Sequence, residues 1–424
     1  MKGLYELKSE VIDRELCTCC GTCIGVCPVD TLGFADGEVK DVGGRCVQCG
    51  SCNAVCPGKA FPMDEWMEAL FQTGYDTGRL FGVYQGIYNA CPKDDKIRAA
   101  GSSGGMVTHI LTALLEAGSI DGAVAVREKQ DEPYRFESFI AVDREQILSA
   151  AQSKYVLIPV NQVIRKIRQS GKRIAYVGLP CQIHGMRKAM KQDAGLAGQI
   201  VVLISLFCGF NMTEEATEYL IAKSRIKKSE IEMLKYRQRK GDRTGFYIRG
   251  KQGKEFFVSK HGYTFMNLLF SPKRCWKCFD YSGEFADISV GDAWEKGAGF
   301  SRVIVRTQVG RGIFEMLTDR ETMYVEPCDE SAIMKTQKKV VSYKKGQIGI
   351  RKGRMKHFPE YGVEFARCRG KHQIKGMVLY MILCFFKSRA GKWAIQILPF
   401  PILTKVSERL KGREVTAVEN QQHI

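Results

Sequence analysis

Between residues 61 and 335 the chain alternates short apolar runs with segments whose hydrophobic positions recur at helical spacing. The stretch that follows the sequence GSSGG shows the pattern best. Its helically spaced apolar residues are Met106, Val107, Ile110, Leu111, Leu114 and Leu115. Gly118 predicts the end of this helix, and the run DGAVAV after it predicts a strand. Repeated along the chain, the pattern predicts an α/β (α+β) domain built on a largely parallel sheet.

The GSSGG loop itself, residues 101–105, opens the predicted helix. Small residues at a helix start bring backbone N–H groups close to an anion, and the helix dipole favours negative charge there. The loop therefore predicts a phosphate-binding site, with a plain N-cap and flexible loop as the alternative. The segment GRGIFE, residues 310–315, lacks the third small residue of a nicotinamide fingerprint.

Two predicted strands end beside a cysteine, Cys181 in GLPCQIHG and Cys208 in LFCGF. Ligands of open parallel sheets collect beyond the carboxyl ends of the strands, so both cysteines are predicted to lie at a site. Cys275 and Cys278 form a C-x2-C pair that is followed by a strand, ADISVG, where a thioredoxin-like dithiol would open a helix. Simple burial in the core is the alternative for Cys181 and Cys208 taken singly.

The N-terminus carries the densest cysteine pattern, C-x2-C-x2-C-x3-C-P, which occurs twice. The eight cysteines of the two runs are Cys17, Cys20, Cys23, Cys27, Cys46, Cys49, Cys52 and Cys56. The repeat predicts two [4Fe-4S] clusters in a small bacterial-type ferredoxin domain, residues 1–66. Paired C-x2-C is also a zinc signature, but zinc sites rarely place three ligands at this spacing before C-P. Cys19 lies off the spacing and is predicted to pack beside the cluster without binding it.

Seventeen cysteines in 424 residues, together with an N-terminus that has no apolar signal core and no twin arginine, predict a cytoplasmic chain with reduced thiols. The charge is uneven, because residues 331–424 hold twenty Lys and Arg against five Glu and so carry +15 of the net +18. Their two apolar segments, residues 377–386 and 393–403, are each about half of the roughly 20 residues that a membrane-spanning helix needs.

We expect residues 336–424 to form a basic extension that docks on an acidic partner subunit or lies at the anionic inner membrane surface. No nucleic-acid-binding motif accompanies the charge, so nucleic acid is not a predicted partner.

Taken together and in this order, the motifs GSSGG, GLPCQIHG, FCGF and CWKCFDYSGEFADISVGDAW resemble the beta-subunit family of coenzyme F420 hydrogenases and dehydrogenases. The resemblance covers roughly residues 64–335. The members most similar to this chain carry an N-terminal two-cluster ferredoxin module; they include F420H2 dehydrogenase subunits and the plant 7-hydroxymethyl chlorophyll a reductase. The resemblance implies an FAD-containing electron-transfer enzyme with a third [4Fe-4S] cluster in a domain of residues 67–335.

The resemblance also implies ligands. In bacterial two-cluster ferredoxins the last cysteine of each run binds the other cluster. The implied cluster ligands are Cys17, Cys20, Cys23 with Cys56, then Cys46, Cys49, Cys52 with Cys27, and for the third cluster Cys181, Cys208, Cys275 and Cys278. The implied FAD residues are Ser102, Ser103, Gly104, Gly105, Thr108, Ser153, Lys154 and Tyr155. Asp292 is a candidate hydrogen-bond partner of ribose or flavin, and His184 a candidate proton donor; a strand-end turn and a structural role are the alternatives.

The predicted function is electron exchange between [4Fe-4S] clusters, supplied by ferredoxin or a partner subunit, and a hydride carrier such as coenzyme F420 through FAD. Because the chemistry would be centred on the flavin, no catalytic side chain is predicted beyond His184. Two alternatives stay open: an electron-relay subunit without catalysis of its own, and a reductase of another small acceptor. The sequence leaves the substrate and the direction of electron flow undetermined.

Overall fold

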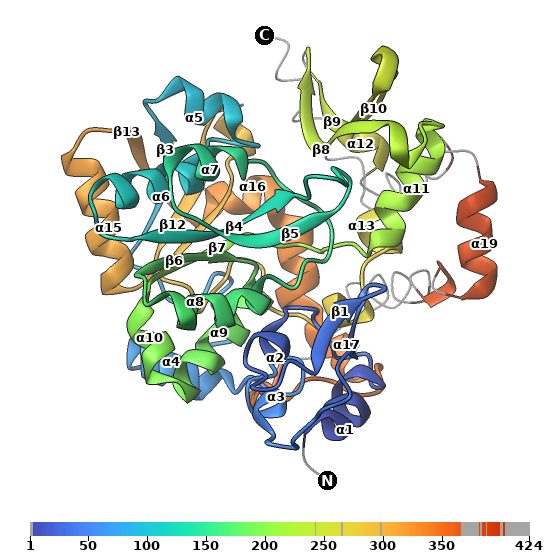
Figure 1. Ribbon diagram of the computed structural model, residues 1–424. Helices are drawn as coiled ribbons and strands as arrows, with labels where there is room; N and C mark the ends of the chain where they lie inside the picture. The colour runs from blue at the N-terminus through green and yellow to red at the C-terminus, as the bar shows by residue number, and fades with distance from the viewer. Residues whose placement is uncertain are drawn as a thin grey trace.

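An eight-stranded sheet runs through the centre of the molecule, as the computed structural model shows (Figure 1). The structure describes residues 3–241, 243–263, 266–296, 299–365, 381, 384–386, 388–398 and 402. The strand order is β13-β3-β12-β11-β7-β6-β4-β5. The strands are β3 (Gly86–Pro92), β4 (Gly122–Glu128), β5 (Phe136–Ala141), β6 (Ile174–Gly178), β7 (Ile200–Leu206), β11 (Ile288–Asp292), β12 (Ser301–Val305) and β13 (Met323–Cys328).

The predicted parallel arrangement is present at the centre of this sheet, where β11, β7, β6 and β4 pair in parallel. The flanking pairs are antiparallel, so that five strands point one way and β5, β12 and β13 point the other. The carboxyl ends of the four central strands therefore meet at one edge, which is where ligands of such sheets collect.

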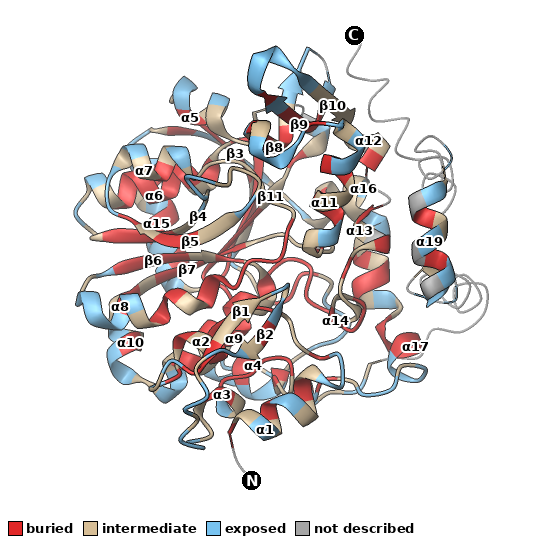
Figure 2. Cartoon of the chain, turned by 45° about the vertical axis from the view of Figure 1, so that its right-hand side comes forward, coloured by how far each residue is buried: buried red, intermediate tan, exposed pale blue. Residues whose placement is uncertain are grey.

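Helices cover both faces of the sheet (Figure 1). The helices on one face are α6 (Met106–Glu116), α7 (Arg144–Ser149) and α15 (Gln308–Asp319), and those on the other are α4 (Met63–Phe71), α8 (Ile164–Ser170), α9 (Pro180–Gln192) and α10 (Ala194–Gln199). Because successive side chains of a strand point to opposite faces, Ala175 packs in the core under α6 while its neighbour Tyr176 packs in the core under α9. Figure 2 shows the central strands buried along most of their length, as expected for a sheet that has helices packed on both faces.

The N-terminal residues form a small domain against α8 and α9 (Figure 1). Its elements are α1 (Leu4–Leu7), the π-helical turn η1 (Lys8–Ile12), α2 (Thr22–Gly25), the hairpin β1 (Leu32–Ala35) and β2 (Glu38–Asp41), and α3 (Ser51–Ala54). Buried Asn161, in the 3-10 turn η2 (Val160–Val163), donates to Thr22 Oγ1 at 2.7 Å, and its backbone N–H donates to Cys20 O at 2.8 Å. These bonds fix the cysteine loops against the larger sheet.

A second, three-stranded antiparallel sheet stands beside the large one (Figure 1). It contains β8 (Ile231–Lys240), β9 (Arg243–Gly250) and β10 (Glu255–Ser259). The remaining elements are α5 (Asp95–Ala100), α11 (Glu214–Ser224), η3 (Lys228–Glu230), η4 (Lys251–Gly253), α12 (Lys260–Tyr263), α13 (Met266–Leu269), α14 (Lys273–Trp276), η5 (Trp294–Lys296), α16 (Glu330–Val341), η6 (Ser342–Gly346), α17 (Ile348–Lys352) and α19 (Arg389–Ile397).

The stretch after residue 335 differs from the extension that the sequence predicts. Val341, Ile348 and Tyr361 are buried in the core, because α16, η6 and α17 fold back onto the large domain.

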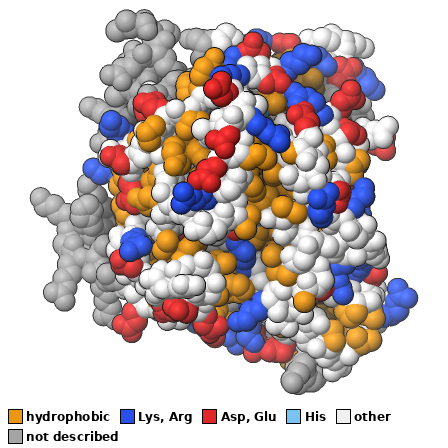
Figure 3. All heavy atoms as spheres, turned by 90° about the vertical axis from the view of Figure 1, so that its left-hand side faces the viewer, with side chains coloured by type: hydrophobic (Ala, Val, Ile, Leu, Met, Phe, Trp, Pro, Cys, Tyr) orange, Lys and Arg blue, Asp and Glu red, His pale blue; other side chains and the backbone are white. Residues whose placement is uncertain are grey.

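The apolar segment at residues 377–386 and the chain beyond residue 402 fall mostly outside the described residues. No helix within the described part of the chain is long and apolar enough to cross a membrane. On the face shown in Figure 3, acidic and basic side chains are interspersed.

Candidate functional site

One cavity of the N-terminal domain is lined by Cys17, Cys20, Cys23 and Cys56, which come from both cysteine runs. Gly21 opens α2 in the left-handed conformation, with φ 83°, which a residue with a Cβ resists. Burial raises the pKa of the Cys56 thiol to about 12 and raises that of Cys23 as well. Such thiols become thiolates only when a cation or metal compensates for the lost solvation. A metal cluster bound by the four sulfurs would supply that compensating positive charge.

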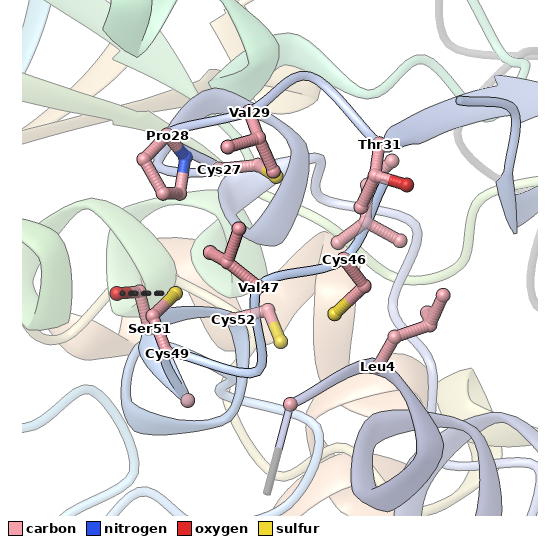
Figure 4. Close-up of a pocket in the computed structure, with 13 residues that line it drawn as sticks. Leu4, Cys27, Pro28, Val29, Thr31, Cys46, Val47, Cys49, Ser51 and Cys52 are labelled. Carbon is pink, nitrogen blue, oxygen red and sulfur yellow. Dashed lines mark hydrogen bonds between the residues drawn. The ribbon is translucent and has the colours of Figure 1, made fainter. Parts of the chain in front are cut away.

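A second cavity is lined by Cys27, Cys46, Cys49 and Cys52, again with one cysteine from the other run (Figure 4). Cys49 is exposed and its Sγ lies 3.4 Å from Ser51 Oγ. This hydrogen bond is the main cause of a lowered pKa for the Cys49 thiol. The crossed grouping of the eight cysteines is the one that the ferredoxin resemblance implies, and the exposed Cys49 brings this cavity to the surface.

Cys19 lines neither cavity. Its backbone N–H donates to Cys17 Sγ at 3.4 Å, and its own Sγ lies 3.8 Å from Gly37 O. An N–H donor at a ligand sulfur is the kind of contact that adjusts an iron-sulfur potential without binding the metal. The position agrees with the prediction that Cys19 packs beside a cluster.

The third cysteine group gathers at the carboxyl edge of the large sheet. Cys181 lies in the first turn of α9 after β6, and Cys208 follows β7. Cys275 lies in α14 and Cys278 just after it. Burial raises the pKa of the Cys181 thiol well above its usual range, and the charges of Cys208, Cys278 and Cys275 raise it further. Four thiols that are distant in sequence are therefore electrostatic neighbours.

Interactions between thiols also relate the three groups to one another. The pKa of Cys23 is raised by burial and, among other charges, by Cys52 of the second cavity. Cys20 of the first cavity in turn raises the pKa of Cys181. The first cavity is thus adjacent to both of the other groups, and the order runs from exposed Cys49 inward to the sheet. Across the described residues no three His, Cys, Asp or Glu side chains are spaced to bind a single metal ion.

The residues with an implied FAD role come together at another part of the same edge. The backbone N–H of Ser153 donates to Ser102 Oγ at 2.8 Å, and the N–H of Gly104 donates to Ser301 Oγ at 3.1 Å. Gly104 must be glycine, because a Cβ there would lie 2.5 Å from Ser301 N. Gly105 caps α6 with φ 80°, and buried Thr108 follows in its first turn. The predicted phosphate loop is therefore a glycine turn held between two segments.

Asp292 and Tyr155 join this group through Arg237, which the sequence left as part of a basic run. Arg237 Nη1 lies 2.9 Å from Asp292 Oδ1, and its guanidinium packs 4.9 Å from the ring centre of Trp294. Burial alone would raise the pKa of Asp292, but Arg237 and Lys260 lower it. Tyr155 is partly buried, and desolvation raises the pKa of its hydroxyl. The structure thus adds Arg237 to the predicted set.

Lys154 has an unusual environment for a lysine. Its Nζ donates to the carbonyls of Ala150 at 2.6 Å and Ala151 at 2.7 Å, and burial lowers its pKa to about 8. Nearby, two buried polar atoms lack a partner, Arg237 Nε and Gln152 Oε1. Unsatisfied donors and acceptors in a buried site are expected where a polar ligand binds. The residues present therefore fit a phosphate-bearing cofactor.

His184 lies apart from these contacts. Its Nε2 is 3.0 Å from Asp280 Oδ2, and its ring stacks on Phe61 with centroids 4.0 Å apart. Burial lowers its pKa, so the imidazole is neutral near pH 7. Its contacts are those of a core residue near the third cysteine group, and its predicted role as a proton donor to flavin stays a prediction.

The sequence analysis missed three cations at the third cysteine group: Lys344, Arg274 and Arg351. All three are buried. Burial would lower the pKa of Lys344, but Cys278, Cys208 and Cys275 raise it above its ordinary range. A basic run such as KKGQIGIRKGR predicts a solvated face, and nothing local in it indicates which lysine turns inward.

Three family models match the chain. Residues 9–61 match the 4Fe-4S dicluster domain, residues 87–165 match the N-terminal part of the coenzyme F420 hydrogenase/dehydrogenase beta subunit, and residues 171–331 match its C-terminal part. The matches cover all eight cysteines of the two N-terminal cavities and all four cysteines of the third group.

Curated relatives agree with these matches. The coenzyme F420-dependent sulfite reductase of Methanocaldococcus jannaschii is 30% identical over 351 residues, 79% of this chain and 51% of that protein, so this chain spans about half the length of that relative. One of the F420H2 dehydrogenase subunits of Methanosarcina mazei is 26% identical over 84% of this chain and 96% of its own length. The F420-reducing [NiFe] hydrogenase complex of Methanosarcina barkeri contains a similar fold, with TM-score 0.53 and 22% identity over 64% of this chain and 93% of that one.

Proposed function

Because the chain belongs to the coenzyme F420 hydrogenase/dehydrogenase beta-subunit family, we propose that it is an FAD-dependent iron-sulfur oxidoreductase. It exchanges electrons between its clusters and a hydride carrier such as coenzyme F420. The observation that supports the proposal is the grouping of eight cysteines around two cavities, with the exposed Cys49 in one of them and Cys20 of the other interacting with Cys181 at the sheet edge where the glycine turn at Gly104 also lies.

We assign two [4Fe-4S] clusters to the two N-terminal cavities with the crossed ligand sets. The third set, Cys181, Cys208, Cys275 and Cys278, would hold a further [4Fe-4S] cluster. Thiolate sulfur is the donor that such clusters require. The support for the third cluster is the electrostatic proximity of the four thiols and the buried cations beside them.

The flavin site would be made by the α6 N-terminus, Arg237 and Asp292. Bound FAD supplies the exchange between a hydride, which carries two electrons, and clusters that carry one at a time. Gly104 and Gly105 allow the backbone to approach a pyrophosphate closely, and the start of α6 favours its negative charge. Asp292, held by Arg237, would accept a hydrogen bond from ribose or the flavin ring. Tyr155, which is partly buried, would line this side of the site.

An electron-relay subunit is the second candidate. Relatives include beta subunits of coenzyme F420 hydrogenases, proteins that are named as subunits, so the chain would have redox partner subunits. In this case the exposed Cys49 end would accept or deliver electrons without turnover of a small substrate. A different acceptor, such as a pigment or an oxyanion of sulfur, is the third candidate; a sulfite reductase is among the relatives, although this chain matches only about half of it.

Turnover by the isolated chain separates these candidates. The anaerobically reconstituted chain, reduced with dithionite and freed of excess reductant, is mixed with oxidised coenzyme F420, and the deazaflavin absorbance is followed. A complete enzyme bleaches the coenzyme at a rate that saturates with its concentration. If the coenzyme stays oxidised while the clusters stay reduced, the relay is favoured and the enzyme assignment fails.

A further inference from the structure

Three cationic side chains are buried around the third cysteine group. Lys344 is 2% exposed, Arg351 3% and Arg274 4%. They come from η6, α17 and α14, three elements that are separate in sequence. Burying a charged group costs several kcal/mol unless an opposite charge lies near it. Backbone carbonyls and aromatic rings offset part of this cost, and a buried anion would offset the rest.

The protein itself provides little negative charge for them. Arg351 Nε donates to Trp276 O at 2.6 Å and Arg274 Nη2 to Pro57 O at 3.5 Å, and both acceptors are neutral carbonyls. Arg351 Nη2 and Arg274 Nε are buried without a hydrogen-bond partner. Among the described residues none of the three cations forms an ion pair with a carboxylate. Buried Asp280, which is bonded to the neutral His184, adds one negative charge nearby, against three positive ones.

Cysteine sulfurs are among the groups that these cations face, together with the ring of Tyr343 at 3.9 Å from the Arg351 guanidinium. Lys344 is hydrogen-bonded to Cys278 and also interacts with Cys208 and Cys275. Cys278 and Cys181 interact with Arg274, and Cys278 interacts with Arg351. Four thiols are neutral and cannot balance the charges, whereas four thiolates on an iron-sulfur core can. Each one-electron reduction adds one more negative charge to such a cluster, which a fixed cation stabilises.

We propose that Lys344, supported by Arg274 and Arg351, tunes the third cluster to a higher reduction potential than it would otherwise have. This inference rests on the proposed third cluster. Lys344 is a positioning residue, because it acts on the cluster through charge and a hydrogen bond to a ligand sulfur. It lies past residue 331, where the family match ends, so the tuning group comes from the part of the chain that folds back as α16 and η6.

The geometry makes Lys344 the strongest of the three. It interacts with Cys278, Cys208 and Cys275, and it is the cation that is hydrogen-bonded to one of these sulfurs, that of Cys278. Its Nζ lies 5.7 Å from the ring centre of Phe210. The low dielectric of a buried site strengthens its effect on the electron. With a higher reduction potential, the third cluster would accept electrons from the flavin more readily.

The test compares Lys344→Met with Lys344→Arg in the full, cluster-loaded chain. Lys338→Met is the matched control, because Lys338 is exposed on α16 and its loss changes net charge equally. Iron content is measured first, and the clusters are then titrated anaerobically with their EPR signals recorded. The third cluster is identified as the signal that is missing in Cys208→Ser.

We expect the midpoint of that signal to fall in Lys344→Met, to be largely restored in Lys344→Arg and to stay unchanged in Lys338→Met. An unchanged midpoint in Lys344→Met with full iron content overturns the inference. If Lys344→Met does not bind the third cluster, Lys344→Gln is measured in its place, because its side chain keeps a hydrogen-bond donor without the charge. The midpoint should fall in Lys344→Gln as well, and an unchanged midpoint overturns the inference. If the wild-type chain binds only two clusters, the proposal of a third cluster fails. That result differs from an unchanged midpoint in a chain that binds all three.

Discussion

Gly185 on α9 is a point where the larger domain packs tightly against the N-terminal cluster domain. A Cβ at residue 185 would lie 2.1 Å from Thr22 Oγ1 and 2.9 Å from Asn161 Nδ2. The first distance is about 1.4 Å short of the ~3.5 Å at which non-bonded heavy atoms normally meet. Gly185→Ala therefore forces Thr22 to move, which breaks the 2.7 Å hydrogen bond that it accepts from Asn161.

The sign of the change in the free energy of unfolding distinguishes helix propensity from overpacking. Helix propensity alone predicts that glycine to alanine inside a helix stabilises by about 1 kcal/mol. Overpacking costs about 1–3 kcal/mol and the lost hydrogen bond about 1 kcal/mol more. We expect Gly185→Ala to destabilise the chain by about 1–3 kcal/mol. Gly198→Ala in α10 is the control, because a Cβ there meets nothing within 4 Å and should stabilise.

Anaerobic thermal unfolding of the cluster-loaded variants measures this difference. Gly185→Ala should melt below the wild type and Gly198→Ala at or above it, with iron content equal in both. Adding Thr22→Ala to Gly185→Ala removes Oγ1 and leaves Thr22 Cβ at 3.3 Å, so the double variant should recover part of the loss. If Gly185→Ala melts as high as Gly198→Ala, the close packing of the two domains at α9 is refuted.

Three further predictions test single residues. Cys208→Ser should remove about a third of the iron and leave the spectra of the N-terminal clusters intact; unchanged iron would mean that Cys208 only packs. Cys19→Ala should keep full iron content, because Cys19 lines neither cavity; its side chain and its backbone both hydrogen-bond to Cys17, so the potential can shift. Loss of iron would make Cys19 a ligand. Burial lowers the pKa of Lys154 to about 8 in the folded chain, against about 10.4 when unfolded. Between these two pH values the unfolded chain binds more protons than the folded one, so the free energy of unfolding rises with pH. Lys154→Met should reduce this rise, which denaturant titrations at pH 8 and pH 10 measure. An equal rise in the variant and the wild type would contradict the prediction.

The features that the sequence could predict are local ones. The spacing of the cysteine runs from Cys17 to Cys56 indicates two clusters because a cluster loop needs its ligands within a short segment. The helix after Gly105 and the strand after it were correctly predicted, since their apolar periodicity is continuous. The third cysteine group was found through a resemblance, because its members are separated by up to 97 residues and no local pattern joins them.

Long-range electrostatics could not be predicted. Residues 344–357 are basic and were expected to belong to an extension that docks on a partner or on a membrane surface, yet Lys344 and Arg351 are buried. Lys344 interacts with cysteine sulfurs, and Arg351 donates to the carbonyls of Trp276 and Tyr343. Arg237 is similar: only the folded sheet brings β8 beside the end of β11, where Asp292 balances it. In both cases the partner that makes burial favourable lies far away in the chain.

The stoichiometry of the anaerobically purified chain tests the central claim most directly. Iron, acid-labile sulfide and flavin are measured per chain, with zinc measured alongside. Three clusters and one flavin predict twelve iron, twelve sulfide and one FAD. Eight iron with no yellow chromophore, or zinc in place of iron, would contradict the account.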